Sequence, residues 1–342
     1  MTQLPHAHPP HDAGGRFDGP VLREDHEAAH WEKEADAIRM LLSDGKRRLF
    51  TTDESRRVQE MLDAAAYWAM PYYERWILAF SSLVIEKGLL PEPVLLAQEA
   101  RLRAEGLDRV EGEPAGAHHG HDHDDHPHHP WQPDHDATET VLSPLRLRGL
   151  AVRNLLLAQG VLTAAEIRAE IERMDARGPH NGAALVVRAW TDAGFAERLA
   201  SDAVAAAAEL GLDAAGTQLA ALFNRPGRHH LVVCTLCSCY PRSILGRPPA
   251  WYKSRAYRAR AVRDPRGILA EFGTTLPEGT ELRVHDSNAE LRYLVVPARP
   301  AGTEGWDATR LAALVTRDSM IGVTPASNPF MTDSRSPQNI KI

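Results

Sequence analysis

The chain has 342 residues, of which 43% are hydrophobic and 25% are charged, and its formal net charge is -7. This is the composition of a globular protein with a real core, and no block of Lys and Arg is present that would follow a phosphate backbone, so we expect no nucleic-acid partner. The chain has no run of about 18 apolar residues and no secretory signal at its start. We therefore expect a cytoplasmic protein that makes no membrane contact.

The first third of the chain is predicted to be mostly helical, over residues 16–110. The cluster that starts at Asp53 can cap a helix that runs through Leu62. Pro71 opens the next helix, whose apolar residues recur at helical spacing as far as Gly88. Glycine is well suited to the position just past a helix end, so we expect the helix to stop there.

Residues 111–140 differ sharply from the flanking sequence, because they consist mainly of His, Asp, Pro and Gly. Eight histidines fall within residues 118–135, and almost nothing apolar accompanies them. Such a segment cannot offset the entropy of ordering itself, so we predict a flexible linker. Its imidazoles suit cobalt, nickel or zinc, and it has two interpretations: a segment that collects metal, or a simple tether.

Helical patterns resume after the linker and give way to strands near the C-terminal end. Helices are predicted over residues 145–157, 163–174, 182–190 and 195–210, the second of them with a capping box at its start. Alternating apolar residues over 282–284 and 291–295 predict two strands joined by a turn. The predicted class is α+β.

Three cysteines are the whole complement of the chain, and Cys234, Cys237 and Cys239 fall within six positions. So tight a cluster of odd number excludes a disulfide framework and leaves a metal site or a redox thiol. A structural zinc site lacks its second pair of ligands here, and an iron–sulfur cluster lacks its remote cysteine. A single ion in the loop is also within reach of the peptide nitrogens between Cys237 and Cys239. Such a claw, with one open position, suits a trivalent Lewis acid.

The run Val-Cys-Thr-Leu-Cys-Ser-Cys-Tyr at residues 233–240 resembles the metal-binding motif of the α subunit of cobalt-type nitrile hydratases and of the equivalent subunit of thiocyanate hydrolase. The resemblance covers about residues 145–326. In this family a threonine at position 235 goes with cobalt, and a serine there goes with iron. Further matches are Asn181-Gly182-Ala183, Leu245-Gly246, Pro248-Pro249, Trp251-Tyr252-Lys253, Tyr257-Arg258, Arg283-Val284, Tyr293, Arg299-Pro300, and the runs at 302–306 and 316–323.

The N-terminal segment resembles the first half of the β subunit of the same family. The matching residues are the runs at 11–15 and 19–21, Asp53-Glu54, Arg56, Tyr72-Tyr73-Glu74-Arg75-Trp76 and Glu86-Lys87-Gly88-Leu89. The small barrel that ends a complete β subunit has no counterpart in this sequence. The resemblance therefore implies a β half fused ahead of an α subunit, with the barrel supplied by a separate polypeptide.

The resemblance also implies roles for individual residues. Cys234 is the expected axial thiolate, and Cys237 and Cys239 are the expected equatorial ligands that become sulfinate and sulfenate. Ser238 and Cys239 are expected to donate deprotonated amide nitrogens to the metal. Arg56 matches the arginine that binds the oxidised sulfurs, although a solvated charge on a helix face is the alternative. The second such arginine belongs to the missing barrel.

One departure from nitrile hydratases concerns the substrate. Those enzymes usually have Trp-Pro after Tyr-Pro, whereas this chain has Arg242-Ser243. Together with the adjacent Arg56 and Arg57, Arg242 favours an anionic substrate such as thiocyanate, because a guanidinium offsets the cost of desolvating the anion. Pairing of Arg242 with a local carboxylate is the alternative. The sulfenate of Cys239 is the expected nucleophile or base, with Ser238 and Tyr72 or Tyr73 positioning substrate and water.

These inferences predict four segments: a β-like helical domain over 1–110, the His-rich linker over 111–140, an α-subunit-like domain with a helical arm and a layered α/β body over 141–330, and a tail over 331–342. The predicted function is hydration of a C≡N bond by a non-corrin Co(III) enzyme, with Fe(III) as the alternative metal. Thiocyanate would give carbonyl sulfide and ammonia, and an organic nitrile would give an amide. A cobalt carrier without turnover is the third hypothesis. The expected partners are a separate barrel subunit in a hetero-oligomer and a cobalt-loading activator.

Overall fold

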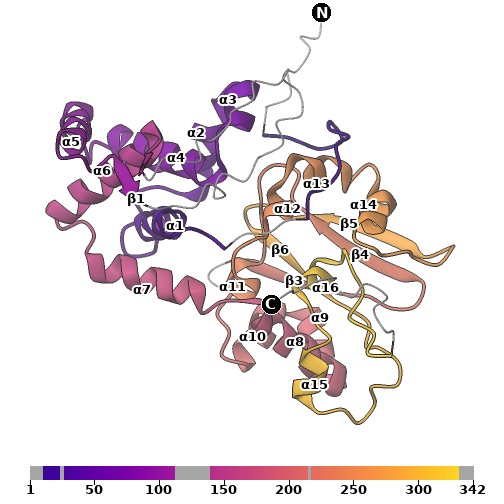
Figure 1. The fold of residues 1–342 in the computed structure, drawn as a ribbon. Coiled ribbons are helices and arrows are strands. Elements are labelled where there is room, and N and C mark those ends of the chain that lie inside the picture. Colours follow the sequence, from indigo (N-terminus) through magenta and orange to yellow (C-terminus); the bar gives the residue numbers. More distant parts are fainter. Residues whose placement is uncertain (1–10, 24–26, 112–138, 215–216, 331–342) are drawn as a thin grey trace, which may run out of the picture. The chain divides into compact units, whose positions relative to one another are not determined.

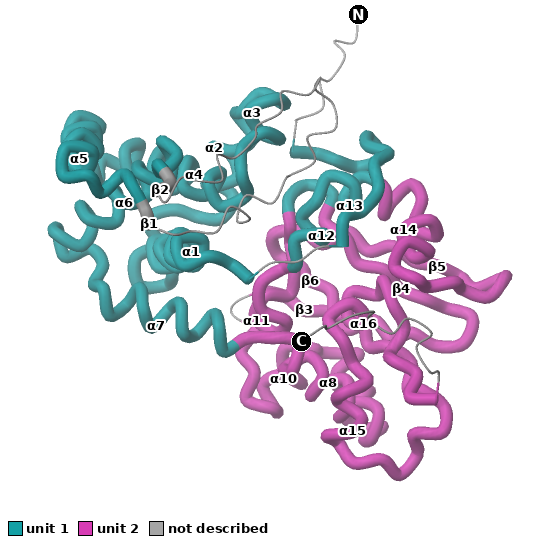
Figure 2. The backbone as a smooth tube through the Cα atoms, in the orientation of Figure 1, with its two compact units in different colours: residues 1–176, 235–237, 249–259 teal, residues 177–234, 238–248, 260–342 magenta. Residues whose placement is uncertain are grey.

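The computed structural model describes residues 11–23, 27–111, 139–214 and 217–330, and it divides the chain into two compact units. Unit 1 contains residues 1–176 together with the short segments 235–237 and 249–259. Unit 2 contains the remaining residues (Figure 2). Residues 112–138, with nearly all of the predicted linker, and the predicted tail at 331–342 lie outside the described residues.

Unit 1 is built almost entirely from helices (Figure 1). Its helices are α1 (His30–Ser43), α2 (Thr52–Glu60), α3 (Ala64–Ala69), α4 (Tyr72–Glu86), α5 (Glu92–Ala104), α6 (Pro144–Ala158), α7 (Ala164–Asp175), α12 (Ala250–Lys253) and most of α13 (Arg255–Arg260). Two short strands, β1 (Arg109–Glu111) and β2 (Glu139–Val141), pair antiparallel. Among the described residues, no helix is both long and apolar enough to cross a bilayer.

The helix starts and stops in unit 1 follow local rules. Helix α4 begins directly after Pro71, and Gly88 follows its end with a φ of 71°, so this prediction is confirmed. Helix α7 begins at the predicted capping box, in which the Thr163 side chain accepts from the Glu166 amide. Helix α2 uses Thr51 as its cap rather than the acidic cluster, because the threonine hydroxyl satisfies an amide in the first turn.

Helix α1 is an element that the sequence pattern did not predict. Its buried face carries the polar residues Glu32, Asp36 and Arg39 beside apolar ones, which obscures the apolar period. Asp36 accepts a hydrogen bond from Arg39 at 3.0 Å, and the Arg39 guanidinium lies 4.7 Å from the centre of the Trp76 ring. Pairing and stacking therefore allow these charges to be buried in the core.

Unit 2 combines helices with two small parallel sheets (Figure 1). Its elements are α8 (Pro179–Thr191), α9 (Ala193–Ser201), α10 (Ala203–Glu209), β3 (Gln218–Phe223), β4 (Arg228–Val233), α11 (Arg242–Leu245), α14 (Pro265–Glu271), β5 (Glu281–Asp286), β6 (Leu291–Val296), α15 (Ala308–Ala312) and α16 (Arg317–Ile321). The mixture of helices and sheets confirms the α+β class.

The strand pairing in unit 2 differs from a local hairpin. The predicted strands are present as β5 and β6, but β5 pairs with β4 and β6 pairs with β3, both in parallel. Strands β3 and β4 were not predicted, because they lack strict alternation. Most of β4 is buried, as is usual for parallel strands that are covered on both faces.

Two glycines allow close approach around the helices of unit 2. A Cβ on Gly182 in α8 would lie 2.4 Å from the side chain of Leu245 and 2.5 Å from that of Met320. Gly322 ends α16 with a φ of 89°, and a Cβ there would lie 2.0 Å from the carbonyl oxygen of His230. Position 322 therefore requires glycine, whereas a side chain at position 182 would have to displace those of Leu245 and Met320.

Strands β4 and β5 bring together two histidines that are sensitive to protonation. His230 Nδ1 lies 2.8 Å from His285 Nε2, and the His285 ring also packs against Tyr293. Burial, followed by the charges of His285, His229, Arg228 and Arg283, lowers the pKa of His230 from 6.5 to about 4. The folded protein therefore holds this imidazole neutral at a pH where an unfolded chain would protonate it.

We expect this pair to make unit 2 sensitive to acid. Between pH 6.5 and about 4, His230 is protonated in the unfolded chain but stays neutral in the folded chain. The free energy of unfolding therefore falls as the pH falls. After allowance for solvent screening, the loss from His230 is about 1–2 kcal/mol. Urea unfolding of wild type and His230→Gln at pH 7.5 and pH 5 measures it. The variant should show the smaller loss, and a control at the exposed His180, His180→Gln, should behave as wild type.

Candidate metal centre

The three cysteines lie in a short loop between β4 and α11. Strand β4 ends at Val233, so Cys234 emerges directly from a buried strand. Cys234 and Cys239 are buried, and Cys237 is half-buried. At the far end of the loop, Pro241 precedes α11. A rigid strand and a helix therefore flank the loop and limit how far its sulfur atoms can separate.

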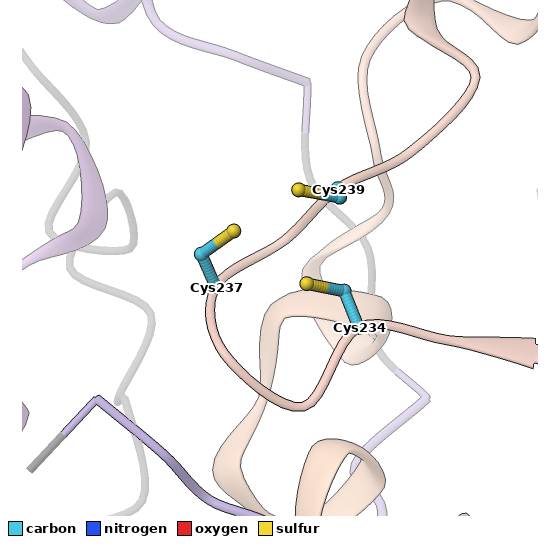
Figure 3. A group of neighbouring side chains, drawn as sticks. All are labelled: Cys234, Cys237 and Cys239. Atoms are coloured by element: carbon cyan, nitrogen blue, oxygen red, sulfur yellow. The ribbon is translucent and has the colours of Figure 1, made fainter. Parts of the chain in front are cut away.

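The cysteine sulfurs point toward one another (Figure 3). The Sγ atoms of all three lie within 4.8 Å of one another. Sulfurs that share one ion at a metal–sulfur distance of about 2.3 Å lie roughly 3.3–3.8 Å apart when they are neighbours around it, so the loop would contract on binding the ion. Soft thiolates that converge in this way suit a transition metal. The three side chains therefore fit a single metal ion.

Arg56 on helix α2 lies against the cysteine loop within unit 1. Its Nη2 atom donates to the Sγ of Cys237 at 3.2 Å, and its Nη1 atom donates to Asp53 at 3.1 Å. The Arg56 side chain is 17% exposed, so it is not an ordinary solvated charge on a helix face. A guanidinium beside a thiol stabilises the thiolate and any anionic oxygen attached to the sulfur.

Tyr72 and Tyr73 at the start of α4 lie beside a lysine that the sequence analysis did not single out as a site residue. The Nζ atom of Lys253 is 4.6 Å from the centre of the Tyr72 ring and 5.3 Å from that of Tyr73. Tyr73 and Lys253 are buried, and the two tyrosine rings meet edge to face. The sequence signal that could have identified Lys253 was its place in the Trp251-Tyr252-Lys253 run, which matches the family pattern.

The other two predicted arginines have different surroundings. Arg57 is 48% exposed and donates to both carboxylate oxygens of Glu86, at 2.8 and 2.6 Å. Arg242 is the first residue of α11 in unit 2 and is partly buried. The roles in substrate binding stay predictions for both. Arg57 already pairs with the carboxylate of Glu86. Pairing with a carboxylate was raised in the sequence analysis as the alternative for Arg242.

Arg258 and His11 are further residues of the site's surroundings that sequence reasoning missed. Arg258 donates to the backbone carbonyl of Thr235 in the cysteine loop. His11 lies 3.3 Å from Glu60, and burial, partly opposed by Glu60, lowers the pKa of the His11 imidazole. Both residues occurred in the quoted family matches, but nothing in their spacing indicated a contact with the loop.

A cluster of three thiols at the end of a buried parallel strand, in an α+β chain, defines a protein with a cysteine-based metal centre. Two family models extend this class to a particular family. The model described as nitrile hydratase, alpha chain, matches residues 143–324, and that of the nitrile hydratase beta subunit, N-terminal, matches residues 8–128. The chain belongs to the nitrile hydratase family, and it combines segments similar to both subunits.

Individual relatives divide between two enzymes of the family. The high-molecular weight cobalt-containing nitrile hydratase subunit alpha of Rhodococcus rhodochrous is 48% identical over 187 residues, which cover 53% of this chain and 91% of that protein. The thiocyanate hydrolase subunit gamma of Thiobacillus thioparus is 40% identical over 208 residues, which cover 57% and 86%. The subunit beta of the latter enzyme is 34% identical over 79 residues, which cover 23% and 49%.

Solved structures show the same division. A recombinant thiocyanate hydrolase comprising partially modified cobalt centres superimposes with a TM-score of 0.52 at 38% identity, and the match covers 58% of this chain and all of that one. A double mutant of Fe-type nitrile hydratase from Comamonas testosteroni Ni1 gives the same TM-score and identity, with 57% and 96% covered. The fold of the α-like part is therefore that of the family.

Proposed function

We propose that the chain is the metal-bearing chain of an enzyme that adds water to a carbon–nitrogen triple bond, with cobalt as its metal. The observation that supports this proposal most strongly is that three sulfurs converge within 4.8 Å and that Arg56 Nη2 lies 3.2 Å from Cys237 Sγ. Relatives that are named as cobalt-containing match the same half of the chain. Thr235 inside the loop supports cobalt, and iron is the alternative metal.

In this proposal Cys234, Cys237 and Cys239 would hold the metal through sulfur, and the amide nitrogens of Ser238 and Cys239 would be further donors. Trivalent cobalt in a non-corrin site would supply a Lewis acid. The proposal assigns the sulfinate state to Cys237 and the sulfenate state to Cys239, and Arg56 would offset their negative charge. The short distance from Arg56 to Cys237 supports this assignment.

The remaining site residues orient substrate and water. The sulfenate oxygen of Cys239 acts as nucleophile or as the base that takes a proton from water. The Ser238 hydroxyl and the phenol of Tyr72 or Tyr73 would supply hydrogen bonds at the reacting groups. Lys253 lies over both tyrosine rings, and its ammonium group restrains them through cation–π contacts.

Thiocyanate is the substrate that we favour. Its hydrolysis balances as thiocyanate plus two waters giving carbonyl sulfide, ammonia and hydroxide. Arg242, a partly buried residue, supports an anion over a neutral nitrile, because a charge-assisted hydrogen bond can replace the anion's lost hydration. The gamma subunit of a thiocyanate hydrolase is among the relatives of the α-like half. An organic nitrile, giving an amide, is the second candidate, supported by the higher identity to nitrile hydratases.

Replacing Arg242 by tryptophan tests the choice of substrate. Loss of one charge-assisted contact of about 1.5–3 kcal/mol should lower kcat/KM for thiocyanate roughly 10- to 100-fold. Hydration of a small neutral nitrile should be unchanged or faster, so it serves as the internal control. The enzyme is assayed with both substrates, and cobalt content is measured in each preparation. An equal loss on both substrates would mean that Arg242 supports the fold rather than the anion.

We further propose that the enzyme is a hetero-oligomer completed by a separate β-barrel subunit. The match to the thiocyanate hydrolase subunit beta covers 49% of that subunit, and the proposal assigns the remaining part to a partner polypeptide. Leu236, inside the cysteine loop, is 44% exposed, as expected of an apolar residue that a partner covers. Co-expression with a barrel subunit should raise turnover per cobalt above that of the chain alone. A cobalt-loading activator remains a prediction.

The proposed division of the chain keeps the predicted boundaries, with a β-like domain over 1–110, a linker over 111–140, an α-like domain over 141–330 and a tail over 331–342.

The alternative function is that of a cobalt carrier that retains the fold without turnover. A carrier would release its cobalt to a chelator and hydrate neither substrate. Metal analysis after chelation, paired with both assays on the purified complex, therefore separates a carrier from the enzyme.

A further inference from the structure

The carbonyl oxygen of Thr235, between the first two cysteines, is held from two directions in unit 1. The backbone amide of Ala13 donates to it at 3.1 Å, and Nη2 of Arg258 donates to it at 2.9 Å. Thr235 is buried. A buried carbonyl that loses its partners costs about 1–3 kcal/mol, so these two donors restrain the peptide unit on which the cysteine loop turns.

Arg258 connects the loop to the N-terminal segment, residues 11–15, which we call the strap. The same guanidinium nitrogen that reaches Thr235 also donates to the carbonyl oxygen of His11. Arg258 is 1% exposed, and its guanidinium lies 5.4 Å from the centre of the Trp68 ring. The buried Arg258 guanidinium donates to two backbone carbonyls and has little freedom to move. It therefore holds the strap and the cysteine loop together.

The strap has its own anchors. The Gly15 amide donates to the carbonyl of Ala259 at 2.8 Å, and the Gly14 amide donates to the carboxylate of Asp12 at 3.1 Å. A Cβ on Gly14 would lie 3.7 Å from the Thr235 side chain, so the strap backbone runs close against the loop. The turn at Asp12 thereby presents the Ala13 amide to Thr235.

We propose that Arg258 and the strap form a clamp that keeps the cysteine loop closed, limits access to the buried thiols and slows loss of the metal. Arg258 acts as a positioning residue, through the Thr235 carbonyl. A loop that is already held in shape loses less entropy when it binds an ion, and it opens less often to release one. The part of the proposal that concerns metal retention rests on the proposed function, whereas closure of the loop does not.

The test compares Arg258→Gln and Asp12→Ala with wild type in the full-length, metal-free chain. The rate at which a small thiol reagent labels the buried Cys234 should rise about tenfold or more in Arg258→Gln, and by a smaller factor in Asp12→Ala. Amide hydrogen exchange at Ala13 should accelerate in both. The matched control is Arg255→Gln, because Arg255 on the same helix stacks on Trp68 and Phe17. It should label at the wild-type rate.

Cobalt retention is measured on the same variants after loading, as the rate of loss to a chelator. We expect the order of loss to follow the order of thiol labelling. Wild-type labelling and exchange in Arg258→Gln, or an equal rise in Arg255→Gln, would overturn the clamp. If Arg258→Gln does not fold, Arg258→Lys and Asp12→Ala carry the same comparison. Failure of every chain, wild type included, to retain cobalt would contradict the proposed function and leave the labelling result to decide the clamp.

Discussion

Replacing Cys234 by alanine is expected to remove tightly held cobalt and to reduce turnover to background. Cys234 is fully buried and is one of three sulfurs that converge within 4.8 Å. Its loss leaves an incomplete donor set, and thiolates hold late transition metals far more tightly than water does. The side chain is small and alanine fills most of its volume, so the fold should survive with a loss of about 1–2 kcal/mol.

The measurement is cobalt per chain after exhaustive dialysis against a chelator, followed by the hydration assay. Val233→Ala is the matched control, because Val233 is the neighbouring buried residue at the end of β4 and offers no ligand. This control should lose stability by a similar amount and keep its cobalt. An inert, stoichiometric cobalt in Cys234→Ala would show that the ion is held elsewhere.

Arg56→Lys is expected to lower kcat about 100- to 1,000-fold, the usual cost of removing one preorganised donor from a reacting centre. Lysine keeps the positive charge but lacks the planar fork that reaches Asp53 and Cys237 together. The fold should be unaffected, since α2 is held by the Thr51 capping box and by the ion pair of Glu54 with Lys87. KM should change much less than kcat.

Steady-state kinetics and cobalt content are measured together, so that a loss of metal is not mistaken for a loss of chemistry. The control is Arg101→Lys, which changes an exposed arginine paired with Glu105 on α5. It should retain wild-type kcat. A wild-type kcat in Arg56→Lys would show that charge alone suffices beside Cys237, and would argue against a directed contact with oxidised sulfur.

Much of the fold was predictable where local rules decide the structure. Pro71, Gly88 and the capping box at Thr163 mark helix ends through backbone groups that are satisfied within a few residues. Helix α1 was missed because buried polar residues interrupt its apolar period, and part of what stabilises them, such as the Trp76 ring beside Arg39, is distant in the sequence. Strand β4 was missed because burial on both faces removes the alternation that predicts a strand.

The sequence by itself placed three cysteines within six positions and indicated a metal site, whereas the convergence of their sulfurs within 4.8 Å depends on how the loop folds. It also supported Arg56 as a partner of the loop, although only through the family resemblance. Only the tertiary structure decided which cations reach the loop: Arg56 contacts Cys237, whereas the adjacent Arg57 pairs with Glu86. Neighbours on a helix point about 100° apart, and which of them faces the loop depends on the packing of elements that are distant in the sequence. For the same reason the contacts of Lys253 with Tyr72 and Tyr73, and of Arg258 with Thr235, became visible only in three dimensions.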